Sequence, residues 1–122
     1  MRLLLAEDDA TTVDAVKLCL EVYKPDFTLT VIDNGREVIN LIKSGTFDGL
    51  ILDLGLPGLD GMVILEELSP FSKVPVIVIT ARHIEEDRLK ALKLGVKDFI
   101  GKPFDFHVFL KSLEKHFEGD FK

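Results

Sequence analysis

The chain has 122 residues, of which 47% are hydrophobic and 30% charged, with a net charge of −6 and a pI near 5.0. These values predict one globular domain over residues 1–122 and argue against direct nucleic-acid binding, because an acidic surface repels the phosphate backbone. The lone Cys19 excludes an internal disulfide. With no apolar run of membrane-spanning length and no signal peptide, we expect a cytoplasmic location and no membrane partner.

Short apolar runs alternate with helical patterns along the chain, which is typical of βαβ units. Strands are predicted at residues 3–6, 27–32, 49–53, 76–79 and 97–100. The second run alternates apolar and polar residues and predicts an edge strand, whereas the first, third and fourth are uniformly apolar and predict central ones. We therefore expect an α/β fold with a doubly wound, five-stranded parallel sheet in the order 2-1-3-4-5.

Five helices are predicted between and after these strands. The first covers about 11–22, the second begins at Asn34-Gly35, the third follows the turn at 56–61, the fourth covers 85–94 and the fifth follows Asp105 as N-cap. Gly95 is expected at the C′ position that ends the fourth helix. The expected inner faces are Val13, Val16, Leu20 and Tyr23; Val38, Leu41 and Ile42; Met62, Leu65 and Leu68; and Phe106, Phe109, Leu110, Leu113 and Phe117.

Three acidic residues, Glu7, Asp8 and Asp9, directly follow the first predicted strand. Two carboxylates about 5 Å apart repel by about 3 kcal/mol at an effective dielectric constant of about 20, so gathering them beside Asp53 requires compensation. Mg²⁺, a hard cation that prefers oxygen ligands, is the natural compensator. The alternative is a solvated acidic turn that caps the next helix. We favour it for Asp9, and for Glu7 and Asp8 considered alone both interpretations stay open.

Three further strand ends carry reactive side chains: Asp53, Thr80 and Lys102. A carboxylate such as Asp53 can attack phosphorus and form an aspartyl phosphate, and the less favoured alternative for this residue alone is a cap of the following loop. Thr80 alone could be an ordinary strand residue, and Lys102 alone a surface residue. In open α/β sheets, ligands bind at the carboxyl ends of the strands. Because the acids, Thr80 and Lys102 all lie at such ends, together they predict a site for a cation and a phosphoryl group.

These segments resemble the receiver domain of two-component response regulators, which has a flavodoxin-like fold. The resemblance covers essentially the whole chain, and it is specific because all its segments occur in order on the expected strands. They are Leu5-Ala6-Glu7-Asp8-Asp9, Leu52-Asp53-Leu54-Gly55-Leu56-Pro57-Gly58-Leu59-Asp60-Gly61, Val76-Ile77-Val78-Ile79-Thr80-Ala81-Arg82 and Asp98-Phe99-Ile100-Gly101-Lys102-Pro103-Phe104.

The resemblance implies a role for each site residue. Asp53 would accept a phosphoryl group from a sensor histidine kinase or a phosphotransfer protein. Mg²⁺, for which Mn²⁺ can substitute, would bind Asp8, Asp53 and the carbonyl of Gly55, with Glu7 holding it through water. Thr80 would bond the phosphoryl oxygens, and Lys102 would pair first with the Asp53 carboxylate and then with the phosphoryl group.

The resemblance also implies how the signal would leave the site. Thr80 and Phe99 would form the switch, and Phe99 would act by changing rotamer because it lacks the hydroxyl of tyrosine. The output face would be the fourth helix, fifth strand and fifth helix, with a possible homodimer through it. The chain would catalyse only its own phosphorylation and dephosphorylation. Lys102-Pro103 is expected to be cis, and Arg82 is expected to cover the phosphoryl group where Gly55 cannot.

Three alternative functions fit the sequence less well. An FMN-binding flavodoxin-like protein would need a phosphate-binding loop after the first strand, where this chain has three acids. A phosphatase with an aspartate nucleophile usually has a second acid two residues later, where this chain has Gly55. A degenerate receiver that only docks is disfavoured because every expected site residue is present.

Overall fold

The computed structural model describes residues 1–23, 26–70, 72–82 and 84–117. Its five strands are β1 (Arg2–Ala6), β2 (Thr28–Ile32), β3 (Gly49–Leu52), β4 (Val76–Thr80) and β5 (Asp98–Gly101). They form one parallel sheet in the order β2-β1-β3-β4-β5. The predicted order is confirmed, and each strand end lies within one residue of its predicted position.

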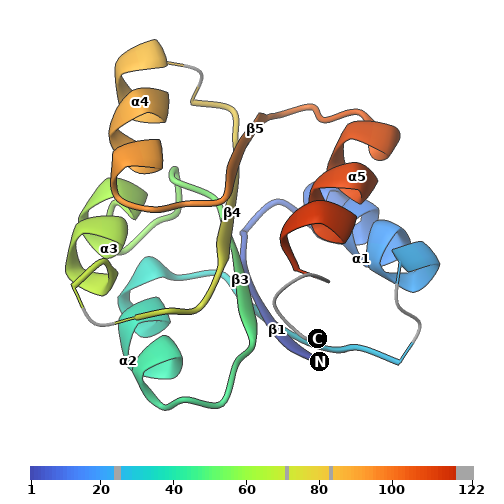
Figure 1. Ribbon diagram of the computed structural model, residues 1–122, viewed down its shortest axis with the longest axis horizontal. Helices are drawn as coiled ribbons and strands as arrows, with labels where there is room; N and C mark the ends of the chain where they lie inside the picture. The colour runs from blue at the N-terminus through green and yellow to red at the C-terminus, as the bar shows by residue number, and fades with distance from the viewer. Residues whose placement is uncertain (24–25, 71, 83, 118–122) are drawn as a thin grey trace.

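The helices cover both faces of this sheet, as right-handed crossovers require. They are α1 (Ala10–Tyr23), α2 (Val38–Lys43), α3 (Gly61–Leu68), α4 (Glu85–Lys93) and α5 (Phe106–His116), and a 3-10 turn, η1 (Gly35–Glu37), precedes α2. In Figure 1 the sheet lies between α2, α3 and α4 on the left and α1 and α5 on the right. None of the helices among the described residues is both long and apolar enough to cross a membrane.

Alternation along β1 divides the apolar side chains into two core layers. Leu3 and Leu5 pack with the buried residues of α1 and α5, while Leu4 and Ala6 pack with those of α2, α3 and α4. The central strands β3 and β4 are buried along their whole length. By contrast, β2 has only exposed and half-buried residues, which confirms the prediction of an edge strand.

The second helix differs from its prediction. The side chain of Asn34 accepts a hydrogen bond from the Arg36 amide at 2.8 Å and begins the 3-10 turn, so the α-helix begins only at Val38. Val38, Ile39 and Ile42 are buried, while Leu41 is half-buried. Leu41 packs against the core as predicted, but the prediction omitted Ile39, which is buried because residues turn by about 100° each and Ile39 lies on the same stripe as Val38 and Ile42.

The ends of the last two helices follow the expected capping chemistry. Gly95 has φ +99° and follows α4 at C′, where only glycine adopts this conformation without strain. The side chain of Asp105 accepts hydrogen bonds from the amides of His107 at 2.8 Å and Val108 at 3.2 Å, so it is the N-cap of α5. On the predicted inner face of α5, Phe109, Leu113 and Phe117 are buried, and Phe106 and Leu110 are half-buried.

Candidate functional site

The register of the sheet brings the predicted site residues to one edge. Ala6 is paired with Leu52, so the residues that follow these two strands emerge together. The amide of Asp53 donates to the carbonyl of Ala6 at 3.0 Å, and the amide of Lys102 donates to the carbonyl of Thr80 at 2.8 Å. These backbone bonds extend the ladders to the strand ends and fix where the side chains of Asp53 and Lys102 begin.

The loop after β3 is held against the loop after β2. The amide of Gly35 donates to the carbonyl of Pro57 at 2.9 Å. The contact is close, because a Cβ at Gly35 would lie 2.4 Å from the carbonyl oxygen of Leu59. At the start of the loop, the amide of Gly55 donates to Oδ1 of Asp53 at 3.0 Å. One carboxylate oxygen of Asp53 is thereby oriented by the loop backbone.

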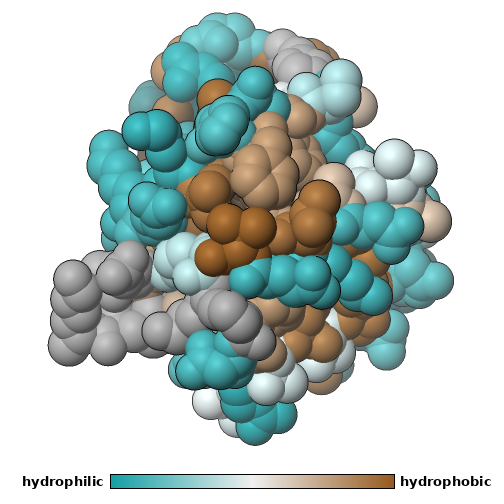
Figure 2. Space-filling view, turned by 90° about the vertical axis from the view of Figure 1, so that its right-hand side faces the viewer, coloured by the Kyte–Doolittle hydropathy of each residue, from teal (hydrophilic) through white to brown (hydrophobic). Residues whose placement is uncertain are grey.

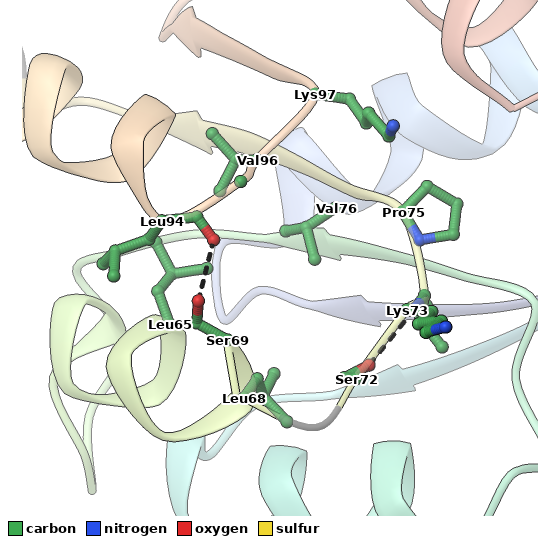
Figure 3. Close-up of a pocket in the computed structure, with 12 residues that line it drawn as sticks. Leu65, Leu68, Ser69, Ser72, Lys73, Pro75, Val76, Leu94, Val96 and Lys97 are labelled. Atoms are coloured by element: carbon green, nitrogen blue, oxygen red, sulfur yellow. Dashed lines mark hydrogen bonds between the residues drawn. The ribbon is translucent and has the colours of Figure 1, made fainter.

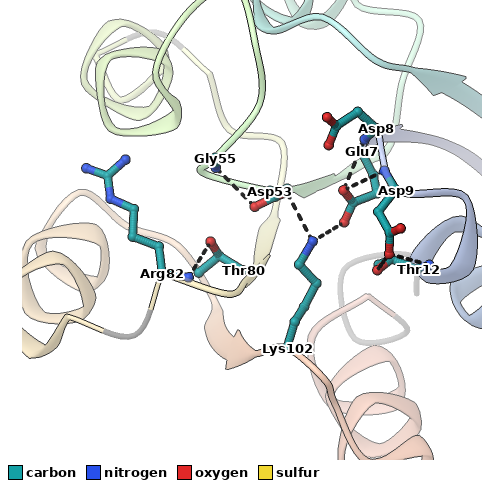
Figure 4. A network of polar contacts seen from close by, with 9 residues as sticks. All are labelled: Glu7, Asp8, Asp9, Thr12, Asp53, Gly55, Thr80, Arg82 and Lys102. Carbon is teal, nitrogen blue, oxygen red and sulfur yellow. Dashed lines mark hydrogen bonds and ion pairs between the residues drawn. The ribbon is translucent and has the colours of Figure 1, made fainter.

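Lys102 pairs with two buried carboxylates. Its Nζ lies 2.8 Å from Oε1 of Glu7 and 3.1 Å from Oδ2 of Asp53 (Figure 4). The side chains of Glu7, Asp53 and Lys102 are 0%, 7% and 15% exposed. Burial raises the pKa of Glu7 above its usual 4.5, although the hydrogen bond from Lys102 acts to lower it. Burial works to lower the pKa of Lys102, but its bonds to the two acids outweigh that and raise it.

Glu7, Asp8 and Asp53 form a group of acids suited to a cation. Each contributes a carboxylate oxygen, and these oxygens all lie within 4.8 Å of one another. Oε2 of Glu7 also accepts hydrogen bonds from the amides of Asp8 at 3.0 Å and Asp9 at 3.2 Å. Asp8 is exposed, so one side of the group faces solvent. Three carboxylates against one lysine leave negative charge, and this oxygen donor set fits a hard divalent cation.

Asp9 has the separate structural role that the sequence favoured. Its Oδ2 accepts hydrogen bonds from the amide of Thr12 at 3.1 Å and from Oγ1 of Thr12 at 2.6 Å. It therefore caps the start of α1, and Figure 4 shows it turned toward Thr12. The prediction that Asp9 caps the first helix is confirmed.

Thr80 and Arg82 lie on the other side of Asp53. Thr80 is buried, and its Oγ1 accepts a hydrogen bond from the amide of Arg82 at 3.1 Å. The Arg82 side chain extends away from Asp53 (Figure 4), with its Nε 2.7 Å from Oδ2 of Asp87 and its Nη1 paired with Asp60. In this state Arg82 does not cover Asp53. Residue spacing did not indicate this network, because Asp60 and Asp87 belong to different elements and neither is at a distance from Arg82 that predicts a contact.

The remaining predicted switch residue lies on β5. Phe99 is half-buried and packs against the core layer of α2, α3 and α4. After this strand the Lys102-Pro103 peptide is cis, as the family resemblance predicted.

A separate hollow of about 260 Å³ lies at the opposite end of the strands (Figure 3). It is lined by apolar residues such as Leu65, Leu94 and Val96, and Oγ of Ser69 donates to the carbonyl of Leu94 at 3.2 Å across it. The lysines at its margin, Lys73 and Lys97, have no acidic neighbours among its lining residues. It therefore lacks the carboxylates of the edge where Asp53 lies.

The fold and the acidic site together define a class of protein, and sequence comparison agrees. The response regulator receiver domain family matches residues 3–114, so the chain belongs to this family, which acts in two-component systems. Its curated relatives are response regulators. Transcriptional regulatory protein QseB of Escherichia coli O157:H7 is 40% identical over 105 residues, which are 85% of this chain and 47% of that protein.

Other relatives and solved structures give the same result. Transcriptional regulatory protein HprR of Escherichia coli K12 is 34% identical over 90% of this chain and 48% of its own length. The chain thus spans about half the length of these curated relatives. The BeF3-activated N-terminal receiver domain of Klebsiella pneumoniae RstA superposes with a TM-score of 0.80 at 25% identity, covering 96% of this chain and 98% of that one.

Proposed function

We propose that the chain is a phosphorylation-dependent switch whose single phosphoacceptor is Asp53. The observation that carries this is the position of the Asp53 carboxylate. One oxygen is held by the Gly55 amide at 3.0 Å and the other lies 3.1 Å from Lys102 Nζ, within a group of acids suited to Mg²⁺. Phosphoryl transfer needs mainly in-line positioning and neutralised charge, and Lys102 supplies one of the required cations.

Mg²⁺, or Mn²⁺ in its place, would supply the remaining positive charge. Asp8, Asp53 and the carbonyl of Gly55 would hold it directly, and Glu7 would act through water while its other contacts stay with Lys102. Thr80 would then bond the new phosphoryl oxygens. Its position at the end of β4, the strand that pairs with β3, supports that role.

The phosphoryl donor would be a sensor histidine kinase or a phosphotransfer protein in the cytoplasm, and the only chemistry would be phosphorylation and dephosphorylation of Asp53 itself.

An apolar area on the layer of α1 and α5 suits a protein partner (Figure 2). In that layer Leu18 and Val22 of α1 are 55% and 57% exposed.

The signal would leave through α4, β5 and α5, with a homodimer through this face as one outcome. The described part of α4 supports this, because Ala91 is its one fully buried residue and Leu89 is 50% exposed. Phosphorylation would replace the single negative charge of the Asp53 carboxylate with the nearly two negative charges of a phosphoryl group, and Thr80 and Phe99 would transmit that change to this face.

The direct test is phosphorylation of the purified chain by a small donor. With acetyl phosphate and Mg²⁺, the intact mass should increase by one phosphoryl group, and the increase should disappear in EDTA. A mass that does not change in Mg²⁺, or that changes equally in EDTA, would remove the basis of the proposal.

The metal site gives a separate prediction. Mg²⁺ should raise the melting temperature of the chain, because a ligand that binds only the folded state at about 100 times its Kd stabilises it by about 2.7 kcal/mol. Asp8→Ala should abolish this rise, whereas Asp14→Ala, which removes an exposed acid of α1, should keep it. Thermal denaturation with millimolar Mg²⁺ and with EDTA measures both. A metal-dependent rise that survives in Asp8→Ala would exclude Asp8 as a ligand.

A further inference from the structure

Arg82 connects two segments that flank Asp53. Its Nη1 pairs with Oδ1 of Asp60, whose Oδ2 accepts a hydrogen bond from the amide of Met62 at 3.0 Å and so caps α3. Its Nε lies 2.7 Å from Oδ2 of Asp87 in the first turn of α4. The guanidinium therefore joins the start of α3 to the start of α4.

The same residue also contacts the hydroxyl that is proposed to bond the phosphoryl group. The backbone amide of Arg82 donates to Oγ1 of Thr80 at 3.1 Å, so the position of Arg82 sets the position of one hydrogen-bond partner of Thr80. Figure 4 shows the Arg82 side chain extending from Thr80 away from Asp53. The backbone of residue 82 is thus tied to Thr80, while its side chain is tied to acids on two helices.

We propose that Asp60, Arg82 and Asp87 form a latch that holds Arg82, two residues after the end of β4, in its resting position and so opposes phosphorylation of Asp53. This inference rests on the proposed function. Arg82 is a positioning residue, because its side chain contacts neither Asp53 nor Lys102 here and acts through Thr80 and α4.

Electrostatics predicts that the latch favours the resting state over the anion-bound state. Before phosphorylation, Arg82 is paired with two carboxylates, and a short movement toward Asp53 would cost it at least one of them. A phosphoryl group or an anionic mimic at Asp53 draws both the Thr80 hydroxyl and positive charge toward itself. Weakening the pair with Asp87 therefore lowers the cost of the movement and favours the anion-bound state.

The affinity for beryllofluoride, a phosphoryl mimic, tests the latch without hydrolysis. In Mg²⁺, Asp87→Asn should bind it about two- to fivefold more tightly than wild type, the factor that a partly exposed ion pair contributes. The control is Glu86→Gln, which removes the same charge from the same turn of α4 at an exposed residue outside the network. Its affinity should equal that of wild type, and the melting temperatures should show that both variants are folded.

A double-variant cycle tests whether Asp87 affects the beryllofluoride affinity through Arg82. In Arg82→Ala, adding Asp87→Asn should leave the beryllofluoride affinity unchanged, because the residue through which Asp87 acts is gone. Equal affinities of Asp87→Asn and Glu86→Gln, or an Asp87→Asn effect that persists in Arg82→Ala, would overturn the latch and leave the phosphoacceptor assignment intact. Failure of wild type to bind beryllofluoride in Mg²⁺ would overturn both.

Discussion

Asp53→Asn should gain no phosphoryl group from acetyl phosphate in Mg²⁺, whereas the wild-type chain should gain one. An amide oxygen is a far weaker nucleophile than a carboxylate, so the substitution removes the reacting group while it preserves the shape of the side chain. The loss should be complete within detection, because Lys102 lies beside Asp53 and Glu7, and Glu7 is also held by the backbone amides of Asp8 and Asp9.

Asp9→Asn is the matched control for this variant. Asp9 lies in the same acidic loop and is committed to capping α1 through Thr12, so its removal should leave phosphorylation in place. Intact mass, followed by peptide mapping of the phosphorylated sample, measures both variants. Phosphate gain in Asp53→Asn equal to that of wild type would show that another carboxylate is the acceptor.

Lys102→Met should be the most destabilising change at the site. It leaves the carboxylates of Glu7 and Asp53 buried without their shared cation, and removal of one partner from a buried pair typically costs about 3–5 kcal/mol. Urea denaturation in EDTA at neutral pH measures the loss. Lys111→Met, which replaces an exposed lysine of α5, is the control and should change the free energy of unfolding little.

The destabilisation by Lys102→Met should depend on pH in a definite direction. The hydrogen bond from Lys102 lowers the pKa of Glu7, which burial raises, so its loss raises that pKa further above the usual 4.5. A carboxyl whose pKa is raised in the folded state contributes its full stability to the fold at a pH below its pKa in the unfolded chain. That contribution is lost as the pH rises through its pKa in the folded state. The deficit should therefore be larger at about pH 7 than at about pH 5. A loss of stability that is the same at both pH values would show that lost packing, and not the charge of Glu7, causes it.

The sheet and the acidic site could be predicted from the sequence because each depends on local pattern plus strand order. Uniformly apolar strands must be central, and an order with β1 beside β3 places Glu7 and Asp53 at adjacent strand ends. The start of α2 was harder, since a capping side chain at Asn34 specifies a turn without specifying whether it is 3-10 or α.

The ion pairs of Arg82 could not be predicted at all. Asp60 lies 22 residues before it in the chain and Asp87 only five after it, and neither spacing indicates a contact. Whether a long, charged side chain turns toward Asp53 or toward another acid depends on where α3 and α4 begin in space. Those positions are set by packing of the whole layer, which local sequence does not encode.

The burial of β3 on both faces has a consequence for the dynamics of the site. Amides in a strand that is covered by helices on both sides exchange with solvent deuterium only when much of the domain opens, so those of Ile51 and Leu52 should be among the slowest. Asp53 follows directly on this strand. The amide of Arg82, whose acceptor is a side-chain hydroxyl, should exchange through a local and cheaper opening. The reacting carboxylate would thus keep its place while the groups that respond to it remain free to rearrange on a faster timescale.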